Sequence, residues 1–312
     1  MSIAVAITNH NQDKQVKKTI DMLMSAEYKP ETIFVMSDDT KFKPIKKYPE
    51  VEVINNKFYQ PNRCDNRNSV IKKFLDSGID QLVFIDGDCY PDTKEFLKNY
   101  ELLLNNHDLV FGTRRHTDVS KLKLPPSDLL TANMDNLFKQ KKLDYSDLRI
   151  VSGAISAWRG AKQFGEKIDL MLTGMIGWSC NFGITRIGLK KLMSFQKDTF
   201  GMETGIFDNS AFNNDWSYED IAMGMDALYA GLDIDITDGV RVVHVSHNRS
   251  DGLFDHIKGR HLIMERYRSL ENSTTLWEKI KRLTMIASAF FTAGLITGMV
   301  TYAISIQQIL GQ

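Results

Sequence analysis

Strand and helix signals alternate along the first 112 residues, and this alternation leaves few folds open to the chain. Short apolar runs typical of buried strands are separated by segments whose apolar residues recur at helical spacing. The predicted strands are 3–8, 32–36, 51–54, 81–85 and 109–112, and the predicted helices are 16–24, 68–75 and 93–104. The pattern predicts an α/β fold with a mostly parallel central sheet that helices cover on both faces.

Acidic residues follow two of these strands. Asp38 and Asp39 come after strand 32–36, and strand 81–85 runs directly into Asp86-Gly87-Asp88. Parallel sheets bind ligands at the carboxyl ends of their strands. Two carboxylates separated by one small residue can hold a divalent cation and leave positions open for phosphate oxygens. Asp-Gly-Asp taken alone is also common in ordinary surface turns.

The second half of the chain is less regular. Residues 114–142 are polar and contain two lysine clusters, so we expect a loop-rich insertion there. The elements predicted downstream are a helix that ends near 193, a helix at 221–229, and strands at 232–236 and 240–245. Glu219 and Asp220 precede the second helix. They also fit a capping box in which Ser217 is the N-cap and Asp220 the third helical residue.

Together these features resemble the family 2 glycosyltransferases and related enzymes with the GT-A (Rossmann-like) fold. The resemblance covers roughly residues 3–247. Its strongest part is residues 66–91, where an Arg-Asn helix start is followed by a hydrophobic strand, the DXD motif and a proline. The implied activity is transfer of a sugar from a nucleotide diphosphate donor, which needs a metal to neutralise the charge on the leaving group.

The resemblance also implies contacts with the donor. Thr8 and either Asp38 or Asp39 would contact the base and the ribose. Arg67 would lie near the pyrophosphate, and Asp86 would touch the ribose or the metal. Thr40 replaces the glycine that usually follows the acidic pair, so the choice between Asp38 and Asp39 stays open. Arg67 could equally be an ordinary surface arginine.

The resemblance implies metal, catalytic and acceptor residues as well. Asp88 and His244 would bind Mn²⁺ or Mg²⁺ together with Asp86, and His247 is the nearest rival of His244. Either Asp220 or Glu219 would act as the general base. The implied acceptor contacts are Trp178, Asn181 and Trp216. The two tryptophans would stack on a sugar ring, or they belong to the core.

Two features refine the expected reaction. The QxxRW motif of processive polymerising members is missing from the sequence, which favours transfer of one sugar at a time. Inversion of stereochemistry is implied by the family likeness. We expect a UDP-sugar donor and a glycan or lipid-linked acceptor.

The C-terminal part of the chain contains an uncharged run. Residues 285–306 carry no charge and as a helix would be roughly 33 Å long, enough to cross a bilayer. Lys279, Lys281 and Arg282 precede this run, as cytoplasmic-side charges do. Gly294 and Gly298 would let two copies pack closely. The segment 279–306 is therefore either a membrane contact or a buried helix. In a membrane, two copies could pair through Gly294 and Gly298 and form a homodimer.

Charge and cysteine content limit the other functions. Lys plus Arg and Asp plus Glu number 39 each, so no overall positive field attracts nucleic acid. Three scattered cysteines and an N-terminus without a secretory signal favour the cytoplasm, at a membrane face if 279–306 binds there. A bacteriophage-type transferase that glycosylates hydroxymethylated DNA bases is the alternative, using the basic residues of 121–142 with Arg260, Arg266 and Arg268. A sugar nucleotidyltransferase is less favoured. Such enzymes usually have a Gly-rich, basic loop after the first strand, and residues 9–13 contain no glycine.

The expected organisation follows from these assignments. Residues 1–250 form the catalytic domain, with a nucleotide-sugar half at 1–112 and an acceptor and catalytic half at 113–250. A helical extension covers 251–284, and an apolar helix covers 285–306.

Overall fold

The computed structural model divides the chain into two compact units, Met1–Ile263 and Met264–Gln312. The described residues are 1–38, 42–43, 45–56, 63–116, 180–212, 218–245, 262–263 and 265–267. Of the predicted insertion at 114–142, residues 114–116 belong to a strand, whereas 117–142 and the apolar segment 285–306 lie outside the described residues. Among the helices that the structure does describe, none combines the length and the apolar character that a membrane span requires.

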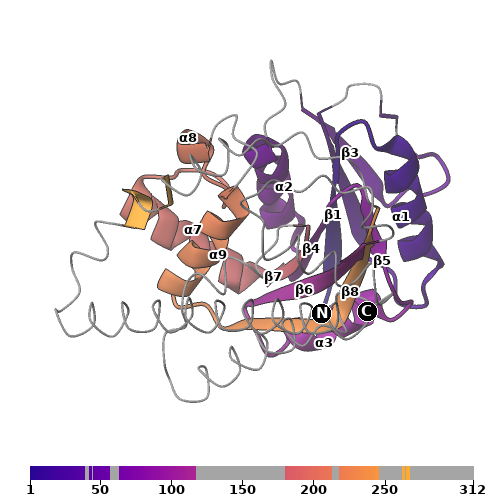
Figure 1. Ribbon diagram of the computed structural model, residues 1–312. Helices are drawn as coiled ribbons and strands as arrows, with labels where there is room; N and C mark the ends of the chain where they lie inside the picture. The colour runs from indigo at the N-terminus through magenta and orange to yellow at the C-terminus, as the bar shows by residue number, and fades with distance from the viewer. Residues whose placement is uncertain are drawn as a thin grey trace, which may run out of the picture. The chain divides into compact units, whose positions relative to one another are not determined.

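The described part of the first unit contains an eight-stranded sheet with the order β3-β2-β1-β4-β7-β6-β8-β5 (Figure 1). The strands are β1 Ile3–Asn9, β2 Thr32–Ser37, β3 Val51–Asn55, β4 Gln81–Ile85, β5 Cys89–Pro91, β6 Leu109–His116, β7 Asn181–Thr185 and β8 Ile234–His244. β1 to β4 pair in parallel, and so do β6 and β8. β7 runs antiparallel to β4 and β6, and β5 runs antiparallel to β8. This mixed sheet confirms the predicted α/β fold.

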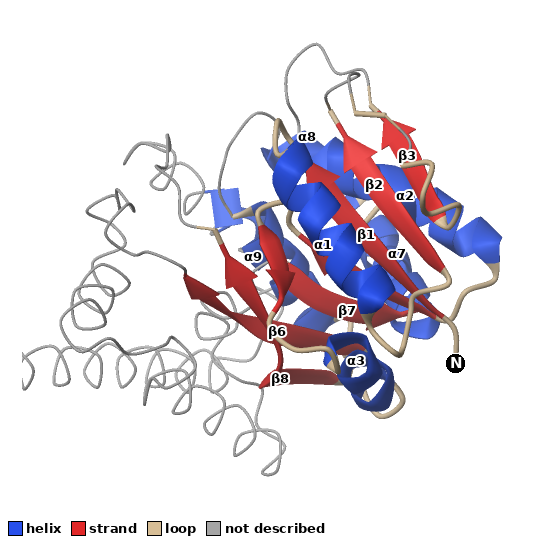
Figure 2. Cartoon of the chain, turned by 90° about the vertical axis from the view of Figure 1, so that its right-hand side faces the viewer, coloured by secondary structure: helices blue, strands red, loops and turns tan. Residues whose placement is uncertain are grey.

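Helices cover both faces of the sheet. The helices are α1 Asp13–Ser25, α2 Arg63–Ser77, α3 Phe96–Leu104, α7 Arg186–Phe200, α8 Asn209–Phe212 and α9 Glu219–Tyr229. α1 and α3 lie on the face turned to the viewer in Figure 2, and the other helices lie on the opposite face. Each strand predicted in the first 112 residues is present.

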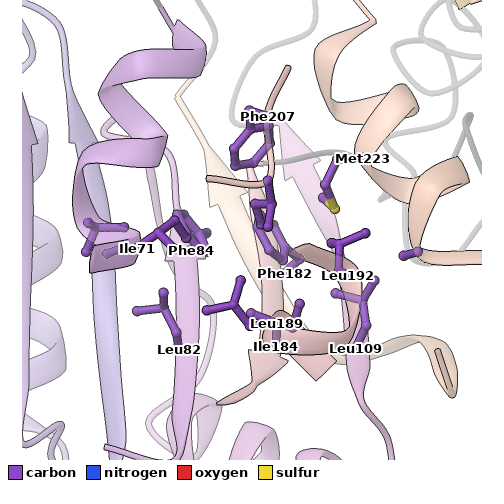
Figure 3. Close-up of a cluster of buried hydrophobic side chains, with 14 of the residues drawn as sticks. Ile71, Leu82, Phe84, Leu109, Phe182, Ile184, Leu189, Leu192, Phe207 and Met223 are labelled. Carbon is purple, nitrogen blue, oxygen red and sulfur yellow. The ribbon is translucent and has the colours of Figure 1, made fainter. Parts of the chain in front are cut away.

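Side chains that alternate along the strands divide the core between the two faces. On β1, Val5 and Ile7 pack with α1 and α3, whereas Ala4 and Ala6 point to the side of α2 and α7. Phe84 lies in the α2 side of the core and stacks on Phe182 with ring centroids 4.5 Å apart (Figure 3). These two cores hold β1, β2 and β4 in place, and the carboxyl ends of these three strands lie at the same end of the sheet.

Three strands differ from the sequence expectation. β7 lies in a mixed apolar and polar stretch for which no strand was predicted. β5 was not predicted, because three residues that end in Pro91 show no periodicity. The predicted strands 232–236 and 240–245 are one strand, β8, which continues through the exposed Asp238 and Gly239. Because β8 is continuous, its last residue, His244, pairs with Cys89 of β5 beside the Asp86-Gly87-Asp88 turn.

Candidate functional site

The carboxyl ends of β1 and β2 form the first part of the candidate site. Asn9 is completely buried there. Its Nδ2 donates to Ser37 Oγ and to Asp13 Oδ1, at 3.1 Å each, and its Oδ1 accepts from the Gln12 amide. Asn9 therefore ties β1 to β2 and to the start of α1. The neighbouring loop brings His10 Nδ1 to 2.8 Å from Asp38 Oδ2.

The Asp86-Gly87-Asp88 turn packs against the end of β1. Thr8 Oγ1 donates to Asp86 Oδ1 at 3.2 Å and accepts from the Gly87 amide at 3.1 Å. A Cβ on Gly87 would lie 2.3 Å from the Thr8 carbonyl oxygen and 2.7 Å from Gln12 Oε1. Only glycine fits so close to the backbone of another strand. The turn is thus built into the sheet edge, unlike a free surface turn.

Asp88 faces His244. Asp88 Oδ2 lies 3.3 Å from His244 Nε2, and both side chains are largely buried. Asp88, Cys89 and His244 offer ligand atoms that all lie within 4.8 Å of one another. A carboxylate oxygen and an imidazole nitrogen suit Mn²⁺, so the donor set fits the expected cation.

Cys89 belongs to this group although the sequence did not predict it as a metal-site residue. The pKa of its thiol is raised well above the ordinary value, first by burial, then by the hydrogen bond and charge of Cys180 and by Asp88 and Asp86. The thiol is therefore protonated at neutral pH. Soft sulfur ligands select metals other than Mn²⁺ and Mg²⁺, so Asp88 and His244 are the better donors.

Arg67 connects the turn to α9. Its Nη2 donates to Asp86 Oδ1 at 3.1 Å, and its Nη1 donates to Glu219 Oε1 at 2.9 Å. Arg67 is 4% exposed, so it is not an ordinary surface arginine. Burial acts to lower the pKa of the guanidinium, but the charges of Asp86, Glu219 and Asp220 raise it above its usual value. The cation is therefore permanent, and three carboxylates gather around it.

The start of α9 presents two carboxylates in different environments. Glu219 is 3% exposed, whereas Asp220 is half-buried and its Oδ1 accepts from the Ile221 amide at 2.8 Å. The N-cap is Tyr218, with φ of 77° and without a side-chain cap. The expected capping box differs here, because Asp220 is the second residue of the helix and not the third. Ser217 lies outside the described residues.

The expected acceptor residues are placed differently or lie outside the structure. Asn181 is completely buried in β7. Its Nδ2 donates to the carbonyls of Thr113 and Val240, and its Oδ1 accepts from Tyr100. These contacts link strands and α3 inside the core, so we leave Asn181 out of the acceptor site. The acceptor candidates Trp178 and Trp216 lie outside the described residues, as do the donor candidate Asp39 and the alternative metal ligand His247.

The structure brings most of the predicted residues to one sheet edge. Thr8, Asp86, Arg67 and Glu219 form a chain of direct contacts. Asp88 of the same turn forms a second pair with His244 at the end of β8, and the charge of Asp220 acts on Arg67. Sequence reasoning assigned no role to Asn9, although an asparagine that ends a buried strand was a usable signal.

Known structures with a similar fold include glycosyltransferases. S. aureus TarS 1–349 has a TM-score of 0.52 at 15% identity over 85% of this chain and 65% of that one. The same protein with UDP-GlcNAc gives 0.51 at 13%, over 91% and 79%. The mannosyltransferase PcManGT from Pyrobaculum calidifontis, in complex with GDP-Man and Mn²⁺, gives 0.50 at 12%, over 96% and 79%. Such identities show the fold alone, and this chain spans 65% of the first TarS structure.

The sequence comparison is more specific than the structural one. No curated protein sequence matches the chain. The family model described as "Glycosyl transferase family 2" matches residues 4–161, just over half of the 312 residues, including Arg67 and the Asp86-Gly87-Asp88 turn. With the mixed sheet covered on both faces and the similar known folds, the chain belongs to glycosyl transferase family 2 and has the GT-A fold.

Proposed function

We propose that this protein is a metal-dependent glycosyltransferase that moves one sugar from a nucleotide diphosphate donor to a hydroxyl of a glycan or lipid-linked acceptor. One observation carries the proposal. The Asp86-Gly87-Asp88 turn and the first turn of α9 are far apart in sequence, yet Arg67 contacts a carboxylate of each. A candidate metal ligand set and a candidate base therefore share one sheet edge.

The donor would bind across the ends of β1, β2 and β4. Thr8 and Asp38 stand at the ends of β1 and β2, where a base and a ribose fit, and Asp39 remains the alternative to Asp38. The contacts of Asp86 with Thr8 and Arg67 both involve Oδ1, so Oδ2 is the atom that can turn to the ribose or to a cation. The similar TarS and PcManGT structures hold UDP-GlcNAc and GDP-Man, and we favour a UDP-sugar here.

Asp88 and His244 are the residues that would hold Mn²⁺ or Mg²⁺, with Asp86 beside them. A cation bound there supplies neutralisation of the negative charge that develops on the departing nucleoside diphosphate. His244 suits this role as a neutral imidazole. Cys89, which directly follows Asp88, would lie beside these ligands.

Asp220 is the better candidate for the general base. Glu219 is buried and already binds the Arg67 guanidinium, so it is less available to an acceptor. Asp220 is more exposed and lies next to it in the first turn of α9. It would take the proton of the acceptor hydroxyl while the oxygen attacks the anomeric carbon from the face opposite the leaving group, which inverts the stereochemistry.

Trp178 and Trp216 would provide stacking faces for the acceptor sugar. A lipid-linked acceptor would place the protein at the cytoplasmic face of a membrane, with residues 279–306 as the contact. Dimer formation through that segment remains part of the same proposal.

Donor hydrolysis across a panel of UDP-, GDP- and CMP-sugars, with and without Mn²⁺, tests the proposal. We expect turnover of one donor class that depends on the metal. A duplex DNA containing hydroxymethylated bases serves as one acceptor arm, and transfer to it would favour the alternative substrate class. Metal-independent behaviour, or turnover of none of the donors, would contradict the proposal.

A further inference from the structure

Arg67 joins two segments of the candidate site that lie far apart in the sequence. It lies in α2, 19 residues before Asp86 and 152 residues before Glu219, and it donates to both. All three side chains belong to different elements of the fold: a helix, the turn after β4 and the start of α9. The side chain is therefore a bridge between the expected metal-binding end and the expected catalytic end of the site.

The bridge is buried, and this makes stability a poor explanation for it. Arg67 is 4% and Glu219 3% exposed. Removing two charges from water costs about as much free energy as their attraction returns, so a buried ion pair often contributes little net stability. Removing one partner of such a pair is nevertheless costly, because the other charge stays buried without compensation. The two side chains therefore keep a well-defined relative position. Such an arrangement is better suited to fixing positions than to holding the fold together.

The guanidinium also rests on a rigid platform. Its Cζ lies 5.3 Å from the centroid of the Phe207 ring, and that ring packs against Phe84 and Phe182 at 6.1 and 6.2 Å. Asn68, the next residue of α2, accepts from the amides of Ile206 and Phe207 and donates to the Phe207 carbonyl. Helix α2 thus holds both the arginine and the phenylalanine ring that it contacts. Figure 3 shows Phe207 in the same cluster as Phe84 and Phe182.

We propose that Arg67 is a positioning residue, which holds the Asp86 turn and the Glu219 end of α9 at a fixed separation and so places Asp220 for catalysis. The proposal rests on the proposed function, because it assigns Asp220 as the base. It replaces the pyrophosphate contact that the family resemblance implied. Both terminal nitrogens of Arg67 already donate to protein carboxylates, and its exposure leaves little surface for a phosphate.

The test compares Arg67→Lys and Arg67→Met with Arg186→Lys as a matched control. Arg186 is also stacked on a phenylalanine, with its Cζ 4.8 Å from the Phe74 ring centroid, and it donates to the carbonyls of Phe74, Leu75 and Ile79. It therefore reports what the loss of a stacked arginine does to the fold away from the site. Lysine keeps the charge at position 67 but lacks the planar fork that reaches two carboxylates.

Two measurements are made on each folded variant. Hydrogen exchange without donor should become faster at residues 86–89 and 219–222 in both Arg67 variants, and near residues 75–79 in Arg186→Lys. With the donor that the panel identifies, kcat should fall by about 10- to 100-fold in both Arg67 variants, because small misplacements of a reacting group cost this much. The donor KM should stay within about threefold. Arg186→Lys should keep the wild-type kcat.

A double variant tests whether Arg67 acts through Glu219. If it does, Arg67→Met combined with Glu219→Gln should have a kcat no lower than that of the more impaired single variant, whereas independent roles would multiply the losses. Multiplied losses would overturn the proposal.

Two further results would overturn the proposal that Arg67 is a positioning residue. One is unchanged hydrogen exchange at 219–222 together with wild-type kcat in Arg67→Lys. The other is a large rise in donor KM at constant kcat, since that marks a donor contact. If the wild-type protein turns over no donor, the proposed function fails. The exchange measurement needs no donor and still shows whether Arg67 holds α9 to the turn.

Discussion

The two ends of the candidate site are held in place in different ways. The Asp86-Gly87-Asp88 turn is fixed by the backbone and hydroxyl of Thr8, by the close fit of Gly87 and by the Asp88 carbonyl, which accepts from the Val245 amide at 2.7 Å. The start of α9 has a left-handed N-cap without a side-chain cap, and Arg67 holds its Glu219. The first end is part of the sheet, and the Arg67 side chain links the second end to it.

This difference suggests a division of work. An end that binds a cation benefits from a preformed set of ligands, since ordering the ligands on binding would cost affinity. An end that carries a base must place one oxygen accurately next to an acceptor. We therefore expect substitution of Asp220 at the α9 end to reduce turnover strongly with little loss of stability, and substitutions at the turn to reduce both cation affinity and stability.

The largest expected effect is at the α9 end. Asp220→Asn should lower kcat by at least about 10²-fold, because an amide cannot accept the proton, while binding of the donor that the panel identifies, measured by calorimetry, stays near that of the wild type. Circular dichroism should show an intact fold. Near-normal turnover in this variant would remove Asp220 as the base and with it the contrast between the two ends.

The next effect concerns the cation at the turn end. Chelation with EDTA should abolish transfer, and added Mn²⁺ should restore it. His244→Ala should weaken Mn²⁺ binding, measured by electron paramagnetic resonance, by at least about 10- to 100-fold, because even the residues that only orient a metal ligand cost this much when they are replaced. An unchanged Mn²⁺ affinity in this variant would show that the cation binds elsewhere.

A substitution at Gly87 sharpens the contrast through stability. Gly87→Ala places a Cβ 2.3 Å from the Thr8 carbonyl oxygen, and overpacking of this kind costs about 1–3 kcal/mol. Urea denaturation should show this loss in the free energy of unfolding, and Mn²⁺ affinity should fall with it. Wild-type stability would mean that the turn is looser than its contacts indicate.

The smallest effect serves as a control outside both ends. Gly201 is the C-cap of α7 with φ of 70° and has no atom within 4 Å of a built Cβ. Gly201→Ala should therefore cost only the strain of a left-handed residue, about 1 kcal/mol. Urea denaturation should show this cost while kcat stays unchanged. A loss of kcat would indicate that general loosening, and not local positioning, governs turnover.

Local sequence patterns were enough to predict the parallel half of the sheet and the turn after β4. Their strands are short, apolar and separated by helices, so each could be identified without knowledge of the others. α2 begins at Arg63, earlier than the predicted residue 68, because the apolar periodicity starts only at Val70. β8 was divided in two because Asp238 and Gly239 are typical turn residues, although the strand continues through them.

The contacts that assemble the site could not be predicted in the same way. The burial of Arg67 depends on carboxylates and an aromatic ring contributed by distant segments. Asn181 has the polarity of a binding residue, but its three hydrogen bonds lie inside the core. In both cases the residue type was visible in the sequence, while its partners were set by tertiary packing.

A crystal structure of the protein with Mn²⁺ and the donor that the panel identifies tests the central claim most directly. The account predicts the cation on Asp88 and His244, the diphosphate bound to it, and Asp220 facing the anomeric carbon across an open acceptor space, with Arg67 still between Asp86 and Glu219. A cation held by other residues, or a donor bound away from the Asp86-Gly87-Asp88 turn, would contradict it.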